Sequence, residues 1–484
     1  MTATSGHRVG TGGLDHLDLA VAIGGGCVAI AAGVSRGPIY GIVGLALAVG
    51  LLAGLRRPVL VGYVAIAVVP VTSGIARGVP IPGLRVSEAV TVAAAIIVLG
   101  RTAGRREFRW QTIDWVAATY VGLHAGLGLV AGSLNSTLDS EGMQVLVGPI
   151  QFFLLYRVVR ATVVTAEQRS TAVRIVILAT MPVSLIAIAQ YVGVPGVQDA
   201  VERLTRSGVF DLWGYSLQNR ATGPFESWHP LAGYLFLPMA TCIALYAEPR
   251  GRILSRWAVT TALGLAVLAL IVSQTLNVVA GVVIVAIVIA ITTRRIRQIL
   301  VPVVAVGIVG AVVFGPVFLA RLDDQGVSDP TSDGLEAPQT ISYRLEVWTD
   351  QYIPALADHW MIGYGPELPS TIEWRSTESL YLTLTLRGGV LLLASFAALA
   401  LYTLREAWRR RRSADDASRV VAVAMIGATA ALVPMHAVFP YFTASGLPQV
   451  YWVLLALMVG PSIRIDHVRT RVSGGVKLLP AGQA

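Results

Sequence analysis

Long apolar segments recur along the chain, and short polar segments that are often rich in arginine separate them. A helix needs about 20 mainly apolar residues to cross the hydrocarbon core of a bilayer. The pattern therefore predicts an all-α fold with about fourteen transmembrane helices. We expect these helices near residues 17–34, 38–55, 58–76, 87–100, 111–132, 144–160, 172–192, 225–247, 254–274, 277–293, 298–319, 379–402, 420–437 and 448–463.

The composition agrees with a polytopic membrane protein. Of the 484 residues, 55% are hydrophobic and 13% are charged, and the mean hydropathy is +0.67. A soluble domain carries about 25% charged residues, so this chain lacks the polar surface that water requires. That excludes a secreted disulfide scaffold, a nucleic-acid binder and a peripheral enzyme. Cys27 and Cys242 lie in apolar segments, so we expect neither a disulfide nor a cysteine metal site.

The basic residues cluster in every second loop and so indicate an orientation. On that side lie 27 of the 37 Lys and Arg residues but 10 of the 28 Asp and Glu residues, a net charge of +17. The opposite side has a net charge of −8. Cytoplasmic loops carry an excess of Lys and Arg, so we expect both termini in the cytoplasm. The first apolar segment, which begins near Leu17, is expected to be a retained span rather than a cleaved signal.

Two long loops lie on the opposite, outward side. In 193–224, apolar residues from Val197 to Leu204 recur at near-helical spacing, which predicts a short helix in the membrane interface. In 320–378, the spacing of Leu345, Trp348 and Tyr352 predicts an amphipathic helix over 342–359. The glycine- and proline-containing segment 323–339 before it is expected to be a mobile connector.

These boundaries divide the chain into four regions. They are an N-terminal transmembrane bundle (1–214), central transmembrane helices that open with the motif RATGPF (215–319), one large extracytoplasmic helical loop (320–378), and C-terminal transmembrane helices with a cytoplasmic tail (379–484).

The RATGPF motif provides the first candidate residues. Arg220 stands where the 193–224 loop re-enters the membrane, and His229 follows in the next helix. An arginine at this depth is either an interfacial anchor or a phosphate contact, since its guanidinium stays charged and can bind two oxygens at once. His229 is either a packed helix-end residue or a base.

The large loop and the helix after it provide the second set. Arg344 and Trp348 are four residues apart and share one helix face, where they either stack to close the loop or contact a ligand. Glu378 stands at the mouth of the apolar span 379–402. A carboxylate there either caps the helix N-terminus or acts as a general base.

The order of these motifs resembles that of the O-antigen ligase and O-antigen polymerase superfamily of bacterial surface-polysaccharide enzymes, most clearly over residues 215–400. The resemblance rests on Arg220-x-x-Gly223-x-Phe225, Arg344-x-x-x-Trp348, Asp358-His359, Gly363-x-Gly365-Pro366, Glu378-Ser379-x-Tyr381-Leu382 with Gly389, and Gly83-Leu-Arg-Val-Ser-Glu88. The chain departs from the family where the ligases have histidine and asparagine, because it has Glu378 and Ser379 there. The family's arginine near a Ser/Thr-rich span end is not evident in 273–277.

The resemblance implies transfer of a glycan from a polyprenyl diphosphate carrier to a hydroxyl of a glycan or lipid acceptor, at the outer face of the plasma (inner) membrane. Arg220 and Arg344 would stabilise the leaving diphosphate without a metal or other cofactor. Glu378 would accept the proton of the attacking hydroxyl, and direct displacement would invert the anomeric centre. Substrate contacts are expected from both arginines and from the aromatic residues Trp348, His229 and Tyr381. Both a ligase and a polymerase fit.

Two other functions remain open at this point. A secondary transporter or flippase of lipid-linked sugars would have broken helices, inverted repeats and charges deep in its spans. The middle of most apolar segments here is almost free of charge. A non-catalytic membrane scaffold would tolerate replacement of any single outward arginine or glutamate.

Overall fold

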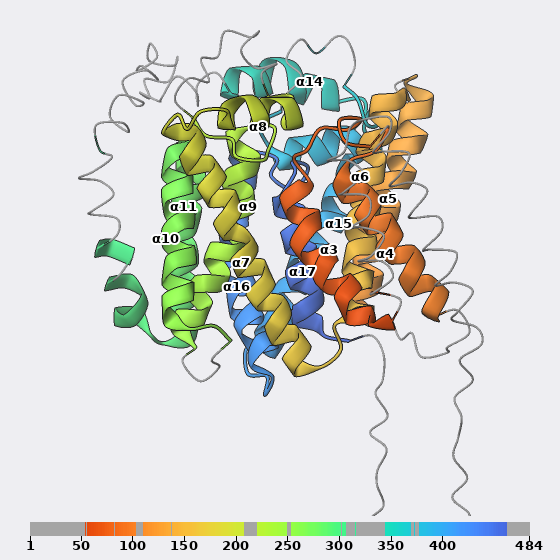
Figure 1. Ribbon diagram of the computed structural model, residues 1–484. Helices are drawn as coiled ribbons and strands as arrows, with labels where there is room; N and C mark the ends of the chain where they lie inside the picture. The colour runs from red at the N-terminus through yellow and green to blue at the C-terminus, as the bar shows by residue number, and fades with distance from the viewer. Residues whose placement is uncertain are drawn as a thin grey trace, which may run out of the picture.

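The chain forms a bundle of upright helices, as the computed structural model shows (Figure 1). It describes residues 54–461 apart from 55, 82, 103–109, 137, 208–219, 249–252, 302, 306–314, 316–343, 369–371 and 373–376. Within those ranges the regular elements are helices, and the one β-bridge joins Ile81 to Leu84. The expected all-α class is therefore confirmed for the described residues.

The bundle contains eleven of the expected helices. They are α3 (Pro58–Thr72), α4 (Val86–Thr102), α5 (Thr112–Leu134), α6 (Ser140–Thr162), α7 (Ala166–Tyr191), α9 (Trp228–Ala247), α10 (Arg256–Ser273), α11 (Leu276–Thr293), α15 (Leu380–Arg410), α16 (Asp416–Val438) and α17 (Leu447–Val459). Helix α7 begins earlier than expected and α15 ends later. The expected spans 17–34, 38–55 and 298–319, and the connector 323–339, lie wholly or mostly outside the described residues.

Eight of the described helices are long and apolar enough to cross a membrane. They are α5, α6, α7, α9, α10, α11, α15 and α16. Helices α3, α4 and α17 are apolar but shorter. The chain is therefore a multi-pass membrane protein, as its composition indicates.

The centre of the bundle is formed by α9 and α17. Every residue of α17 is buried, and so are most residues of α9. A helix that is apolar on all sides can be surrounded by protein or by lipid, and the burial of these two helices shows that they are surrounded by protein. Helices α7, α10 and α16 pack on α9, while α6 and α16 pack on α17.

One end of the bundle is held together by buried charges. Asp114, near the start of α5, pairs with Arg157 and Arg160 near the end of α6, and it accepts a hydrogen bond from Tyr156 at 2.8 Å. Arg160 also donates from Nε to the carbonyl of Gly460 at 2.8 Å, just beyond α17. Because a buried charge without a partner is costly, this network fixes the relative positions of three helices.

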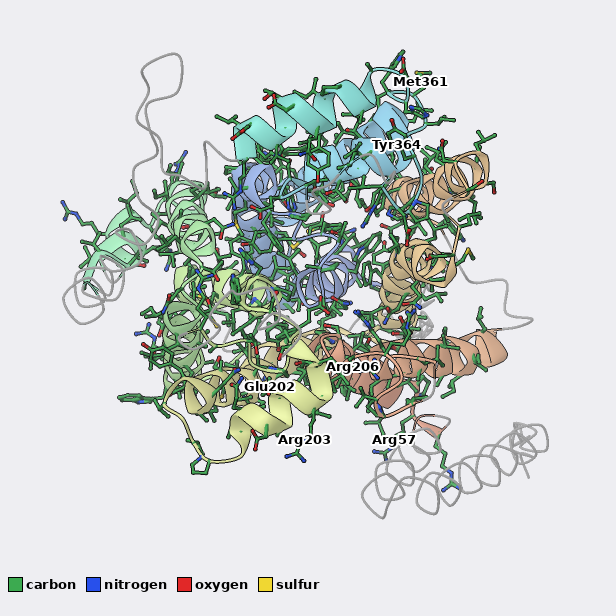
Figure 2. All side chains as sticks on the ribbon, turned by 90° about the horizontal axis from the view of Figure 1, so that it is seen from above. Arg57, Glu202, Arg203, Arg206, Met361 and Tyr364 are labelled. Carbon is green, nitrogen blue, oxygen red and sulfur yellow. The ribbon has the colours of Figure 1, made fainter. Side chains whose placement is uncertain are left out.

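Two short helical segments lie across the opposite end of the bundle (Figure 1). One is α8 (Val197–Thr205), which confirms the helix expected in 193–224. The other runs through residues 344–356 and includes the π-helical turn η3 (Trp348–Tyr352) and α14 (Ile353–Leu356). Seen from above, α8 lies at one edge with Glu202, Arg203 and Arg206, and the second segment lies at the opposite edge and leads to Met361 and Tyr364 (Figure 2).

Candidate active site at the end opposite the buried charges

Arg344 and Glu378 form an ion pair across this end of the bundle. The Nε of Arg344 donates to the Glu378 carboxylate, and both side chains are mostly buried, with exposed fractions of 23% and 28%. Glu378 lies one residue before the N-cap of α15, and the N-cap Ser379 makes no side-chain capping bond. The Glu378 carboxylate is turned toward the loop arginine, and among the described residues it accepts no hydrogen bond from the N–H groups at the start of α15.

Trp348 holds the loop helix against the start of α15. Its indole Nε1 donates to the carbonyl of Thr377 at 2.8 Å, directly before Glu378. Trp348 follows Arg344 by four residues, so the two side chains lie on the same helix face. They contact the adjacent residues Thr377 and Glu378. The buried Tyr352 and Val347 pack beneath them with Leu386 of α15. Among the described contacts, Arg344 and Trp348 do not stack on each other but make these two separate contacts.

The RATGPF motif forms a tight turn that a side chain of α7 stabilises. The backbone N–H groups of Thr222 and Gly223 both donate to Oε1 of Gln190 at 2.9 Å. Gly223 has a φ of +54°, a conformation that glycine adopts without strain. Phe225 is fully buried after the turn. The motif therefore places Arg220 at a fixed position before α9.

Arg220 contacts two neighbours beside the start of α9. Its guanidinium lies over the ring of Trp228, 4.5 Å from the centroid, and donates to the carbonyl of Gln274 at 3.0 Å. His229 stacks on Phe439 with the ring centroids 4.1 Å apart and the planes 5° from parallel. Gln274 belongs to the connection between α10 and α11, so Arg220 ties this connection to α9.

Tyr441 packs beside the His229 group of candidate residues. It lies fully buried in the connection from α16 to α17, and its hydroxyl donates to Oδ1 of Asn277 at 2.8 Å. Its ring centroid is 6.4 Å from that of His229 and 4.7 Å from that of Phe439. The connection around Tyr441 therefore packs beside His229 and is bonded to the start of α11.

Tyr381 points toward α16. Its hydroxyl donates to the carbonyl of Val433 at 2.6 Å. This bond joins the first turn of α15 to the last turns of α16.

Helix α15 is broken below these residues, and the loop enters the break. Gly388 and Gly389 have non-helical dihedral angles, with φ +67° at Gly389. The N–H of Tyr364 donates to the carbonyl of Leu386 at 2.6 Å, and the N–H of Val390 donates to the carbonyl of Trp360 at 2.8 Å. A Cβ at position 389 would collide with the Met361 backbone. The loop around Met361 and the break at Gly388–Gly389 therefore pack directly against each other.

Tyr364 fastens this loop from within. Its hydroxyl donates to the carbonyl of Ala355 at 2.7 Å, and its ring stacks on His359 with the centroids 4.1 Å apart. Burial, together with the nearby Asp358 carboxylate, raises the pKa of the Tyr364 phenol above its ordinary value. The hydroxyl therefore stays protonated and keeps its donor role.

Comparison with known families agrees with this part of the chain. A family described as O-antigen ligase matches residues 259–397. The matched segment runs from α10 into α15 and contains Arg344, Trp348, Glu378 and Tyr381. It confirms the resemblance to the O-antigen ligase and polymerase superfamily. A search of curated proteins gave no match. The match and the apolar helices together fit a membrane enzyme of the glycosyltransferase type.

Several residues of this region were not identified from the sequence as part of a site. Tyr441 and Asn277 belong to segments that are 164 positions apart, and no pattern in either segment indicates their hydrogen bond. The sequence does contain a signal for Arg387. It is a charged residue inside an apolar span, directly before two glycines, and such a residue indicates a functional site. Arg85 lies within the quoted segment 83–88, yet its position beside Glu226 appears only in the fold.

Proposed function

We propose that this protein transfers a glycan from a polyprenyl diphosphate carrier to a hydroxyl of a glycan or lipid acceptor. The observation that carries the proposal is the Arg344–Glu378 pair within a segment that matches O-antigen ligases. The pair combines a cation suited to a diphosphate with a carboxylate suited to a proton. Neither group needs a metal or another cofactor for these tasks.

We also propose that the reaction takes place at the outer face of the plasma membrane, in a protein of about fourteen spans with both termini in the cytoplasm. The distribution of charge along the chain supports this orientation. In the fold, the basic ends of α6 and α15 lie away from α8 and the 344–356 segment. The candidate residues lie at the end that carries these two short helices.

The ion pair suggests how substrate binding prepares the base. A diphosphate offers more negative charge to Arg344 than a single carboxylate does, and it accepts the two-pronged contact of a guanidinium. Binding of the donor would therefore draw Arg344 away from Glu378. The released carboxylate can then accept a hydrogen bond from the acceptor hydroxyl. Arg220, held beside Trp228, would provide the second cation for the diphosphate.

The chemical step is a single displacement. The acceptor oxygen forms a bond to the anomeric carbon while the bond from that carbon to the diphosphate breaks, which inverts the centre. The proton of the hydroxyl moves to Glu378, and the charge that develops on the leaving diphosphate is stabilised by Arg344 and Arg220. Trp348, His229 and Tyr381 would contact the sugars.

The test is glycan transfer by the purified full-length protein with its lipid-linked donor. Glu378→Gln keeps the size of the side chain and can still accept a hydrogen bond from Arg344, but it cannot accept a proton. We expect the variant to fold, to bind donor and to lose about 10²–10⁴-fold in transfer rate.

The matched control is Glu346→Gln. Glu346 is exposed on the same loop helix, two positions from Arg344. This variant should transfer at the normal rate. If Glu378→Gln transferred as fast as this control, Glu378 would not be the base, and His229 would become the candidate.

A further inference from the structure

A second group of arginines lines a cavity of about 320 Å³ between α4, α5, α6, α15 and the start of α17. Arg77 and Arg85 come from the connection between α3 and α4, and Arg387 comes from α15. Among the described residues of the lining, Glu88 is the one carboxylate, which gives these residues a formal net charge of +2. None of these residues belongs to the pair at Arg344 and Glu378.

Two of the three arginines are paired. Arg77 forms an ion pair with Glu88. Arg85 lies 3.6 Å from the Glu226 carboxylate and donates to the carbonyl of Ser73 at 3.2 Å. Within the described part of the chain, neither a hydrogen bond nor an ion pair is found for the guanidinium of Arg387. Among the described residues, no carboxylate therefore compensates the charge of Arg387.

The position of Arg387 makes this charge costly. It lies inside the apolar helix α15, directly before the Gly388–Gly389 break. Tyr120 and His124 of α5 are its electrostatic neighbours. A charged residue inside a membrane span that is not paired with another residue marks a functional site by default.

Two further polar atoms at the cavity lack partners in the described structure. His124 lines the cavity with an exposed fraction of 2%, and its Nδ1 is buried without a hydrogen bond. Nε of Arg77 is also buried without one. Buried polar groups are normally hydrogen-bonded, so each such exception calls for a ligand or another explanation. Both residues line the same cavity as Arg387.

The rest of the lining suits a sugar that carries a negative group. The amides of Gln144, Gln151 and Gln449 can bind hydroxyls, and the rings of Phe152 and Phe442 can pack on the faces of a sugar. A guanidinium binds the paired oxygens of a phosphate or carboxylate with two parallel hydrogen bonds. The cavity thus offers a cation for one part of such a ligand and neutral groups for the other.

We propose that this cavity is an anion-binding site that holds a phosphate or carboxylate group on a glycan substrate, with Arg387 as its principal ligand. The assignment to a glycan rests on the proposed transferase function, whereas the anion site itself does not. Arg387 lies seven residues beyond Leu380, the first residue of α15, and so roughly 10 Å along the helix, whereas Glu378 precedes the helix. The site is therefore separate from the proposed catalytic pair.

The experiment measures binding by the purified full-length protein without any transfer. The probes are inorganic pyrophosphate and D-glucuronate, and the readouts are the thermal unfolding midpoint and the dissociation constant. We expect at least one probe to raise the midpoint and to bind saturably. Saturable binding of pyrophosphate identifies the phosphate of a carrier lipid as the source, and binding of glucuronate alone identifies an acidic sugar.

The decisive variant is Arg387→Gln. Because it removes an unpaired, partly buried charge from an apolar helix, it should unfold at the same temperature as the wild type or higher, while the affinity for the probe falls at least tenfold. Arg405→Gln is the matched control, since Arg405 lies on the same helix beyond the cavity and stacks on Tyr402. Its affinity for the probe should be normal.

Arg387→Lys is the second test variant, to be used if Arg387→Gln does not fold. It keeps the charge but loses the two-pronged contact, so it should bind the probe several-fold more weakly.

Two outcomes would overturn the proposal: neither probe binds, or Arg387→Gln binds as tightly as Arg405→Gln. The proposed function fails differently. A protein that binds a probe through Arg387 but transfers no glycan contradicts the transferase and leaves the anion site in place. A protein that transfers glycan but binds neither probe contradicts the anion site alone.

Discussion

At the scale of single residues, the fold changes the meaning of the candidate charges. The chain alone presents Arg344 and Glu378 as separate features, 34 positions apart, and the structure joins them as an ion pair. The placement of Arg344 and Trp348 on one face was predictable, because positions four apart in a helix are neighbours. Their partners were not, because contacts between distant segments depend on how the helices pack.

The two arginines of the proposed diphosphate site can be tested by replacing them with lysine. Arg220→Lys and Arg344→Lys keep the positive charge but lose the planar fork that binds two oxygens. We expect each variant to reduce glycan transfer by at least about tenfold at normal expression, since one charged hydrogen bond is worth about 1.5–3 kcal/mol. The measurement is the transfer rate at saturating acceptor.

Arg203→Lys is the control for this pair. Arg203 is exposed on α8, at the same end of the molecule (Figure 2), and has no proposed contact with the substrate. Its transfer rate should equal that of the wild type. Normal turnover by both Arg220→Lys and Arg344→Lys would mean that the diphosphate binds elsewhere, and the cavity around Arg387 would then be the next place to look.

At the scale of elements, the apolar pattern predicted the helices well and their interruptions poorly. The length and hydropathy of a segment determine whether it can span a bilayer, and this requirement is local. The break in α15 depends instead on the loop that enters it. Gly363 and Gly365 are followed by a proline, a pattern that favours a turn, but nothing in the sequence indicates that this turn inserts between Leu386 and Val390.

This break provides a stability prediction. Gly389→Ala should destabilise the protein by about 1–3 kcal/mol, because alanine is strained at a φ of +67°. The new Cβ would also collide with the Met361 backbone. The loop that carries Arg344 should be displaced as well, so transfer should fall together with the thermal unfolding midpoint.

Gly264→Ala in α10 is the matched control. A Cβ at position 264 meets no atom within 4 Å, and the residue lies in a regular helix. Alanine favours a helix over glycine by about 1 kcal/mol, so this variant should unfold at the same temperature or higher. Equal stability of the two variants would show that the loop does not hold the break in place.

At the scale of the whole molecule, charge and fold agree on two distinct ends. The buried network of Asp114, Arg157 and Arg160 lies at one end, together with the arginine-rich final turn of α15. The other end carries α8, the 344–356 segment and every candidate catalytic residue. A sequence can predict this polarity because the positive-inside rule counts charges without reference to packing.

The orientation of these ends in the membrane is tested by labelling single cysteines. With Cys27 and Cys242 replaced by alanine, one cysteine is introduced at Arg203 in α8 and another, in a separate variant, at Ala414 between α15 and α16. Both positions are exposed. A maleimide that does not cross the plasma membrane should label Arg203→Cys in intact cells and Ala414→Cys only after the membrane is permeabilised.

As the control, both variants must be labelled after permeabilisation, which shows that each thiol is reactive. The reverse pattern would place Arg344 and Glu378 in the cytoplasm, where a carrier-linked glycan at the outer face cannot reach them.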